Sequence, residues 1–419
     1  MRVLAVVYCL PPLLVPAAMC YLKLLLGLRE RGVDVEALAI RPETFAAPLE
    51  GLQDPSLEQL IPEDFVIHWV RSPENHPLIR LLKRSDHVHR ALYRVFEPRK
   101  REWIIAARRV LRRLDLSRYD AILTCSQPHA NHLLGLELKS ELGLPWIAYF
   151  SDPWSRNPYA PRVSRRVTGY HRMLESQVLA RADRVLFTSP EMERLARDGF
   201  EDLLGEKTGV VPHGYVPSWY NIVRAAPPEP GPLRLLHTGH FYGPRSPAPL
   251  IDALGQLGSG ADLASRLSLS FYGSFPEAEQ ERVRQTGLEP VFRIHGTVPY
   301  LESLALMREH DGLLLVDAPL KDEGESVFLP SKLVDYLGAE KPVIALTPRD
   351  GAAARVIDEV GGYRRDISDR AAITDLFREI VAGRPLEPPR PERTALYLYS
   401  ATAGRMLDYI EASLGGRAT

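Results

Sequence analysis

A lysine stands in the first turn of a predicted helix, where the charge of the helix end disfavours it. The helix starts at Pro330-Ser331-Lys332, because proline has no amide to leave unpaired and serine can cap the remaining ones. The helix dipole favours negative charge at this end. Lys332 together with the free amides therefore predicts a site for an anion.

A second cation follows a predicted strand in the same half of the chain. Gly239 and Gly243 lie in a loop that leads from this strand to a helix, and Arg245 comes two residues after Gly243. Glycine allows close approach of the backbone to an anion, and a guanidinium can bind two phosphate oxygens at once. Arg245 and Lys332 together predict a diphosphate site.

The elements that must position these cations read as alternating strands and helices. The chain opens with a strand from residue 2, a helix that ends in glycine and a strand over residues 33–40. Further apolar runs at 119–126, 145–152 and 182–189 are separated by helical segments. Strands that are apolar throughout and alternate with helices indicate parallel sheets covered on both faces. We expect an α/β protein with two doubly wound, Rossmann-like domains and a ligand cleft between them.

The length of 419 residues also favours two domains, and a proline-rich segment at 224–234 is the best candidate for a linker. The predicted parts are an N-terminal domain over residues 1–222, a linker over 223–234, a C-terminal domain over 235–390 and a final helical segment over 391–419. Its amphipathic helix is expected over roughly residues 394–415, and we expect this last segment to pack back toward the N-terminal domain.

Composition excludes several classes of protein. A formal net charge of −1 argues against a globally basic nucleic-acid binder. The three cysteines form no CxxC motif and no His/Cys cluster at metal spacing, which favours a reducing, cytoplasmic compartment and no structural metal. The uncharged stretch over residues 3–22 is interrupted by prolines, so we interpret it as strand, loop and helix, and not as a membrane anchor.

One segment departs from this neutrality. Residues 71–113 contain thirteen Lys and Arg against four Asp and Glu, with apolar residues between them. A solvated basic face would explain this pattern, and so would contact with an anionic membrane surface or a phosphate-bearing acceptor. Binding to nucleic acid is a weaker interpretation, because aromatic residues that could stack on bases are sparse there.

The second half as a whole resembles a known family. A strand, Gly239, a cation six residues later, a proline-led helix with an internal acid, and Lys341-Pro342-Val343 at the next strand are similar to a GT-B glycosyltransferase of family 4. The resemblance covers nearly the whole chain. It implies two Rossmann-like domains, a nucleotide diphosphate sugar as donor, retention at the anomeric carbon, and neither metal nor cofactor.

The resemblance also assigns roles in donor binding, with one departure. Asp335 takes the position of the acid that holds the nucleotide ribose, but the acid expected at position 327 is Val327. Either Glu325 reaches the donor sugar, or the amides of Phe328 and Leu329 replace the missing acid. The loop with His295 and Val298 corresponds to the base-binding segment. The predicted donor-binding residues are Gly239, His240, Arg245, His295, Val298, Glu325, Phe328, Leu329, Pro330, Ser331, Lys332 and Asp335.

Two loops in the first half resemble those that line the active site in this family. His129 lies in a Pro-His loop and is predicted to hydrogen-bond the donor sugar, whereas Asp152, in an Asp-Pro-Trp loop, is predicted to orient or deprotonate the acceptor hydroxyl. The structural alternatives are a helix-start residue for His129 and a turn residue for Asp152.

The expected function is transfer of a sugar to a glycan or lipid-linked acceptor, as in bacterial surface polysaccharide or glycolipid assembly. Contact with an anionic membrane through residues 71–113 would make the enzyme peripheral on the inner face of the membrane. Two other functions stay open, a nucleotide-sugar epimerase of the same fold and a non-catalytic nucleotide-sugar-binding subunit. The first is motivated by the shared architecture, and the second by Val327.

Overall fold

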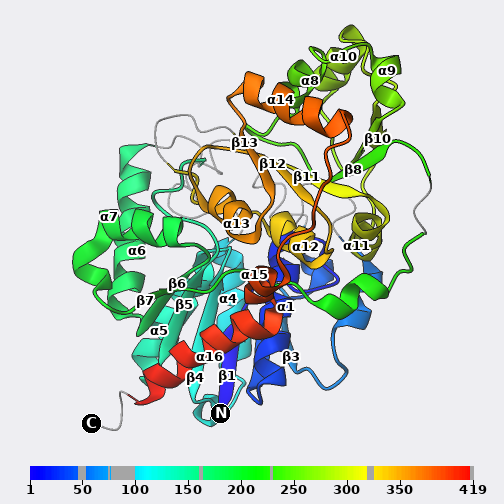
Figure 1. The fold of residues 1–419 in the computed structure, drawn as a ribbon. Coiled ribbons are helices and arrows are strands. Elements are labelled where there is room, and N and C mark those ends of the chain that lie inside the picture. Colours follow the sequence, from blue (N-terminus) through cyan, green and yellow to red (C-terminus); the bar gives the residue numbers. More distant parts are fainter. Residues whose placement is uncertain are drawn as a thin grey trace. The chain divides into compact units, whose positions relative to one another are not determined.

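The structure is a computed structural model that describes residues 1–45, 53–73, 76, 100–159, 164–226, 230–318 and 325–415. Two compact units divide the chain, the first formed by Met1–His213 with Tyr399–Thr419 and the second by Gly214–Leu398. Each unit contains its own parallel sheet (Figure 1). All three cysteines are buried free thiols.

Within the described residues, the first unit has a seven-stranded sheet in the order β3-β2-β1-β4-β5-β6-β7. Its inner strands are almost wholly buried, as expected for a sheet covered on both faces, whereas the edge strands β3 and β7 are only partly buried. The strands are β1 (Arg2–Val6), β2 (Asp34–Ile40), β3 (Ile67–Val70), β4 (Ala121–Ser126), β5 (Trp146–Phe150), β6 (Arg184–Phe187) and β7 (Thr208–Val210). The α-helices are α1 (Pro16–Glu30), α4 (Lys100–Leu111), α5 (Ala130–Leu142), α6 (Arg165–Arg181), α7 (Pro190–Leu204) and α16 (Tyr399–Gly415).

The second unit repeats this topology with six strands, in the order β10-β9-β8-β11-β12-β13, over the part of the chain that is described. The strands are β8 (Leu233–Thr238), β9 (Leu267–Tyr272), β10 (Phe292–His295), β11 (Gly312–Val316), β12 (Val343–Thr347) and β13 (Tyr363–Asp366). The α-helices are α8 (Ala248–Leu254), α9 (Gly260–Ala264), α10 (Glu277–Gln285), α11 (Tyr300–Glu309), α12 (Ser331–Gly338), α13 (Ala352–Val360), α14 (Arg370–Val381) and α15 (Pro391–Thr394).

The strand orders confirm the expected fold class of two Rossmann-like sheets. In each sheet the chain reverses its direction of strand addition once, between β1 and β4 in the first unit and between β8 and β11 in the second. Ligands of doubly wound sheets bind beyond the carboxyl ends of the strands at this point. The end of β8 is therefore where the fold itself favours a ligand.

The division between the units lies nearer the N-terminus than the proline-rich segment. Residues 214–222, predicted to belong to the first domain, lie in the second unit and contain the short 3₁₀ helix η5 (Pro217–Asn221). The Tyr220 hydroxyl donates a hydrogen bond of 2.5 Å to the carbonyl oxygen of Asp335. A Cβ on Gly338 would lie 2.4 Å from the same hydroxyl, so η5 packs tightly on α12.

The final helix belongs to the first unit, where it lies against α1 (Figure 1). It begins at Tyr399 and not at the expected residue 394. A Cβ on Gly27 would stand 2.6 Å from the carbonyl oxygen of Tyr399, and Arg31 Nε donates to the carbonyl oxygen of Ser400 at 2.8 Å. The glycine in α1 thus allows the close approach of α16.

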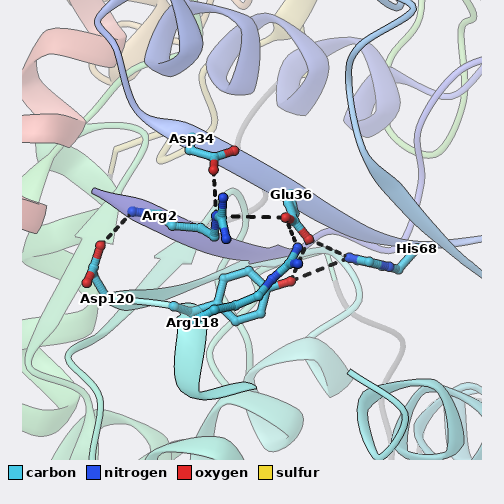
Figure 2. Close-up of polar contacts among 7 residues, drawn as sticks. Arg2, Asp34, Glu36, His68, Arg118 and Asp120 are labelled. Carbon is cyan, nitrogen blue, oxygen red and sulfur yellow. Dashed lines mark hydrogen bonds and ion pairs between the residues drawn. The ribbon is translucent and has the colours of Figure 1, made fainter. Parts of the chain in front are cut away.

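A buried carboxylate joins three strands of the first sheet on the β3–β2–β1 side (Figure 2). The side chain of Glu36 is 4% exposed, and it accepts hydrogen bonds from Arg118 and from the Tyr119 hydroxyl at 2.6 Å. His68 Nε2 lies 2.7 Å from the same carboxylate, and Arg2 Nε lies 3.9 Å from it. Partners on β1, on β3 and on the segment before β4 therefore all converge on β2.

Among the residues that the structure describes, no helix is both long enough and apolar enough to cross a membrane.

Candidate functional site

The carboxyl end of β8 is where the second sheet opens. The pairing of β8 with β11 ends at Leu236 and Leu313, so His237 and Thr238 extend beyond it. The buried side chain of Tyr336, on α12, enters here: its hydroxyl accepts a hydrogen bond from the Thr238 amide at 2.9 Å and donates to the Leu314 carbonyl oxygen at 3.4 Å. These bonds bring the first turn of α12 close to the loop after β8.

Lys332 reaches from that first turn toward the end of β8. Its Nζ lies 3.3 Å from His237 Nε2. A Cβ on Gly239 would stand 2.7 Å from Lys332 Nζ. Gly239 has a φ of +105°, a backbone conformation that residues with a side chain rarely adopt. Glycine is thus needed at position 239 to make room for the ammonium group of Lys332, in addition to allowing a ligand to approach.

Arg245 belongs to the same cluster of charges. Its Nε lies 3.3 Å from Asp317 Oδ1, and its guanidinium carbon lies 4.9 Å from the centre of the Tyr242 ring. The side chain of Asp317 is 3% exposed, and its Oδ2 has no hydrogen-bond partner within the described residues. Burial lowers the pKa of Arg245, but Asp317 and Tyr242 raise it by more, so the guanidinium remains charged.

The two cations act on each other electrostatically. Burial and, secondly, the positive charge of Arg245 lower the pKa of Lys332 to about 7, with Asp317 acting in the opposite direction. Burial is the largest cause of the lowered pKa of His237, and both cations lower this pKa as well. The structure therefore brings Lys332 and Arg245 into one cluster around a single buried carboxylate, as the diphosphate hypothesis requires.

The start of α12 differs in detail from the sequence-based expectation. Pro330 occupies the N-cap position, and Ser331 is the first helical residue, with no capping hydrogen bond from a side chain. The first turn contains no acidic residue that would compensate the helix dipole. An anion at this helix end would supply the missing negative charge.

The segment before α12 is fixed by contacts to the loop after β12. The Ser326 amide donates to the Asp350 carbonyl oxygen at 3.0 Å, and the Ala352 amide donates to the Ser326 carbonyl oxygen at 2.8 Å. Val327, at the position of the missing acid, is buried, whereas Glu325 and Phe328 are half-buried. The choice between Glu325 and the amides of Phe328 and Leu329 as sugar ligands stays a prediction.

Asp335 lies on α12 and is 7% exposed. Its Oδ1 accepts a hydrogen bond of 3.1 Å from the hydroxyl of Tyr300, the first residue of α11. This bond orients the carboxylate toward the start of α11, close to the loop in which Val298 lies. The role of Asp335 in binding the ribose stays a prediction.

Two predicted donor ligands lie at or just after the ends of the strands on either side of β9 in the second sheet. His295 is exposed at the end of β10 and stacks on Tyr272, with ring centres 4.3 Å apart. His240 Nδ1 accepts a hydrogen bond from the Ser274 amide at 3.1 Å. That bond leaves Nε2 as the protonated nitrogen of the neutral ring. Burial and, secondly, Lys332 lower the pKa of His240, which favours this neutral form.

In the first unit, His129 follows β4 and occupies the N-cap position of α5, although its side chain makes no capping hydrogen bond. The ring is 4% exposed and stacks on Trp154, with centres 4.9 Å apart. Burial and, secondly, His171 lower its pKa to about 3, and a backbone hydrogen bond to Pro153 acts in the opposite direction. His129 is therefore a neutral group near pH 7, able to share a hydrogen bond but not to carry a positive charge.

Asp152 follows β5 and is half-buried. Its Oδ2 accepts a hydrogen bond of 3.1 Å from the Ser151 hydroxyl. Ser151 in turn contacts the Ser126 carbonyl oxygen and the Tyr21 hydroxyl, which links the ends of β4 and β5 to α1. Asp152 and His129 thus follow the neighbouring strands β5 and β4 of the first sheet, and their roles stay predictions.

Three residues of the candidate site were missed in the sequence. His237 lies inside an apolar strand, Tyr336 lies on the buried face of a helix, and Asp317 comes directly after a strand. The first two residue types read as ordinary packing residues in those patterns. Asp317 carried a usable signal, because a lone acid at the carboxyl end of a parallel strand lies at the ligand-binding edge.

Most of the basic segment, residues 77–99, lies outside the described residues. Helix α4 belongs to its described part, and there Arg108 is paired with Glu137 while Ile105 is 42% exposed. Across the residues that are described, no group of three or more His, Cys, Asp or Glu is placed to hold a metal ion.

Comparison with known proteins supports the glycosyltransferase interpretation. Residues 17–214 match the family model described as a glycosyl transferase 4-like domain. A search of curated protein sequences finds no match to this chain.

Solved structures of the same fold cover nearly the whole chain. Sucrose-phosphate synthase from Thermosynechococcus elongatus is 15% identical, with a TM-score of 0.67 over 99% of this chain and 100% of that chain. AviGT4, a glycosyltransferase involved in avilamycin A biosynthesis, is 16% identical, with a TM-score of 0.54 over 99% and 98%. A putative UDP-N-acetylglucosamine 2-epimerase from Listeria monocytogenes is 13% identical, with a TM-score of 0.56 over 98% and 96%.

At these identities the structural similarity shows the fold, and the family match supplies the activity class. The match ends where the first compact unit gives way to the second, so it does not cover the cluster around Lys332. Together, the family match and the fold identify this chain as a GT-B glycosyltransferase that contains a glycosyl transferase 4-like domain.

Proposed function

We propose that this enzyme transfers a sugar from a nucleotide diphosphate sugar to an acceptor hydroxyl, with retention at the anomeric carbon and without a metal ion. The observation that carries the proposal is the cluster of Lys332, Arg245 and the uncapped start of α12 at the end of β8. Two cations and a helix start suit a diphosphate better than a neutral ligand.

In the proposed reaction, the bond between the anomeric carbon and the β-phosphate oxygen breaks, and negative charge develops on the leaving diphosphate. Lys332 and Arg245 would stabilise that charge, which is the task that a metal ion performs in other transferases. The charge on Arg245 is permanent. Lys332, by contrast, has a pKa near 7 and gains its full charge when the diphosphate arrives.

The acceptor hydroxyl forms the new bond to the anomeric carbon and loses its proton. Asp152 is the proposed group that orients this hydroxyl or accepts the proton. His129 is proposed to share a hydrogen bond with the donor sugar as a neutral imidazole, in keeping with its low pKa. Retention is proposed on the resemblance to family 4 transferases.

The proposed acceptor is a glycan or a lipid-linked sugar, as in assembly of a surface polysaccharide or glycolipid. The exposed Ile105 and the exposed Arg109 on α4 support contact with an anionic membrane. Flotation with anionic and with neutral liposomes at low salt tests this part. Absence of binding to anionic liposomes would leave a solvated basic face.

A panel of nucleotide sugars with different bases and sugars tests the donor. Thermal unfolding should shift upward for one base and sugar, since a ligand that binds the folded state stabilises it. The selected donor is then incubated alone and with candidate acceptors, and the products are identified by NMR. Transfer to an acceptor supports the proposal, whereas inversion of the donor alone would indicate an epimerase. Binding without either reaction across the acceptor panel would indicate a non-catalytic subunit.

A further inference from the structure

His237 lies directly behind the ammonium group of Lys332. It is the fifth residue of β8 and is 1% exposed. Because β8 and β11 no longer pair at this position, the side chain of His237 can bond to the backbone of the neighbouring strand. An imidazole inside an apolar strand needs partners for its polar atoms, because burial without them is costly.

The first nitrogen of the ring has a partner that fixes its protonation. His237 Nδ1 lies 2.9 Å from the carbonyl oxygen of Leu314, and a carbonyl oxygen can only accept a hydrogen bond. Nδ1 therefore carries the hydrogen. Burial, which is the largest cause, and the nearby Lys332 lower the pKa of His237, so the ring stays neutral and Nε2 keeps its lone pair.

The second nitrogen faces Lys332. The distance from His237 Nε2 to Lys332 Nζ is 3.3 Å, and an ammonium group can only donate. The ring is held flat against Phe241, with centres 4.6 Å apart and planes inclined by 9°. The acceptor is thus fixed both in protonation and in orientation, and it stands on the side of Lys332 that faces the sheet.

Lys332 is confined from a second side as well. The position that a Cβ on Gly239 would occupy lies 2.7 Å from Nζ and 3.0 Å from Cε. A long lysine side chain loses rotational freedom when it is held in one place, and a partner that holds it before the ligand arrives removes that cost from binding.

We propose that His237 is a positioning residue for the donor diphosphate: its Nε2 accepts a hydrogen bond from Lys332 and fixes the ammonium group for contact with phosphate oxygens. The inference rests on the proposed function, because it assigns Lys332 to that diphosphate. His237 acts through Lys332 and does not touch the phosphates.

Inorganic pyrophosphate is the probe, because the donor base is not needed to test the anion site. Two substitutions separate the two nitrogens of the ring. In His237→Asn the new side-chain amide nitrogen can take the place of Nδ1, whereas in His237→Gln the new side-chain oxygen can take the place of Nε2 as acceptor. We expect His237→Asn to weaken pyrophosphate binding roughly tenfold by isothermal titration calorimetry and His237→Gln to recover most of that affinity.

Packing effects are controlled with Phe292→Leu, because Phe292 stacks on Phe271 in the same core, with ring centres 5.3 Å apart, whereas the ring of His237 is held by Phe241. Phe292→Leu should bind pyrophosphate as the wild type does. A double-mutant cycle with Lys332→Ala gives the sharpest readout: once Lys332 is truncated, adding His237→Asn should weaken binding no further.

The outcomes separate the two proposals. If the wild type does not bind pyrophosphate, or if Lys332→Ala binds it equally well, the assignment of the diphosphate site is wrong. If Lys332→Ala weakens binding while His237→Asn does not, the inference about His237 alone is overturned. Equal weakening by His237→Asn and His237→Gln, or an effect of His237→Asn that persists without Lys332, would also overturn it.

Discussion

At the scale of single residues, the candidate site depends on a lysine that is only partly protonated at neutral pH. Burial and the charge of Arg245 lower the pKa of Lys332 to about 7, although Asp317 acts against them. A diphosphate beside the ammonium group would raise this pKa again, since an opposite charge favours the charged form. Binding of the donor should therefore take up a proton above pH 7.

This linkage predicts a pH dependence of diphosphate binding. Below the free pKa of about 7, Lys332 is already charged and contributes fully; as pH rises above 7, binding must first protonate it, so the contribution falls. The measurement is the dissociation constant of pyrophosphate for Lys332→Ala divided by that for the wild type. Ionisation of the ligand cancels in this ratio, because both proteins meet the same ligand.

We expect the ratio to be largest near pH 6 and to shrink severalfold by pH 9. The groups that face Lys332 are Arg245, Asp317, His237 and His240, and the lowered pKa values of the two histidines favour their neutral forms. A ratio that stays constant or grows with pH would contradict the assignment of Lys332.

Gly239 gives a second prediction at this scale. In Gly239→Ala, the new Cβ would stand 2.7 Å from Lys332 Nζ and would displace the flexible end of that side chain. We expect pyrophosphate binding to weaken about tenfold, because roughly one charge-assisted hydrogen bond is lost. The matched control is Gly287→Ala, which has a similarly left-handed φ of +67° but meets no atom within 4 Å.

Both alanine variants should lose about 1 to 2 kcal/mol of stability through backbone strain. Pyrophosphate affinity should fall in Gly239→Ala alone. An equal loss of affinity in Gly287→Ala would mean that strain in the second unit, and not the position of Lys332, controls binding.

Single residues were predictable where their type conflicted with their surroundings. Lys332 at a helix start and Arg245 after glycines both stood out, and the structure brings them into one cluster. The role of His237 was not predictable, because it depends on the point at which β8 and β11 stop pairing. That separation is a property of strand pairing and leaves no trace in the residue types.

At the scale of elements, buried polar bonds hold the ends of strands in place. In the second sheet, Tyr336 joins α12 to β8 and β11 through one hydroxyl. In the first sheet, the carboxylate of Glu36 on β2 makes hydrogen bonds and ion pairs with residues on β1, β3 and the segment before β4 (Figure 2). The Glu36 cluster contains none of the predicted site residues, so we expect it to support the fold and not the reaction.

Substitution of Glu36 should therefore affect stability and leave ligand binding unchanged. Glu36→Gln keeps the size of the side chain but removes the charge that Arg118 pairs with, and we expect a loss of about 2 kcal/mol. Asp34→Asn is the control on the same strand, because the Asp34 side chain is 51% exposed and its pair with Arg2 is worth about 0–1 kcal/mol.

Urea unfolding followed by circular dichroism measures both variants, and calorimetry checks pyrophosphate binding. If Glu36→Gln and Asp34→Asn destabilise the protein equally, burial of Glu36 does not set the strength of the cluster. A change in pyrophosphate affinity in Glu36→Gln would show that the cluster acts beyond the fold of its own unit.

Element types were predictable from the sequence, and some boundaries were not. Apolar strands alternating with helices predicted both parallel sheets, because strands that are buried on both faces carry apolar residues on both sides. The final helix was expected from residue 394, but Leu398 adopts an extended backbone and α16 begins at Tyr399. A short helical segment and a longer helix in succession look continuous in an amphipathic pattern.

At the scale of the whole molecule, the two units carry different parts of the proposed reaction. The anion site lies entirely in the second unit, while Asp152 and His129 lie in the first. The expected boundary at residue 222 differs from the observed division, because η5 packs on α12 through Tyr220. Proline content pointed to a linker in the sequence, whereas packing decides to which unit a segment belongs.

This division of roles predicts that Asp152→Ala separates binding from turnover. Donor affinity should stay within about twofold of the wild type, while the rate of transfer falls by about 10²- to 10⁴-fold, as for loss of a general base. Single-turnover transfer and donor titration measure the two quantities. Transfer at an undiminished rate would make Asp152 a turn residue only.

The most direct test of the central claim is calorimetric titration of the preferred nucleoside diphosphate and of its parent nucleoside into the wild type, Lys332→Ala and Arg245→Ala. Loss of one charge-assisted contact is worth about 1.5–3 kcal/mol, so each variant should bind the diphosphate about 10- to 100-fold more weakly and bind the nucleoside unchanged. Unchanged affinity for the diphosphate in both variants would contradict the claim that these two cations hold it.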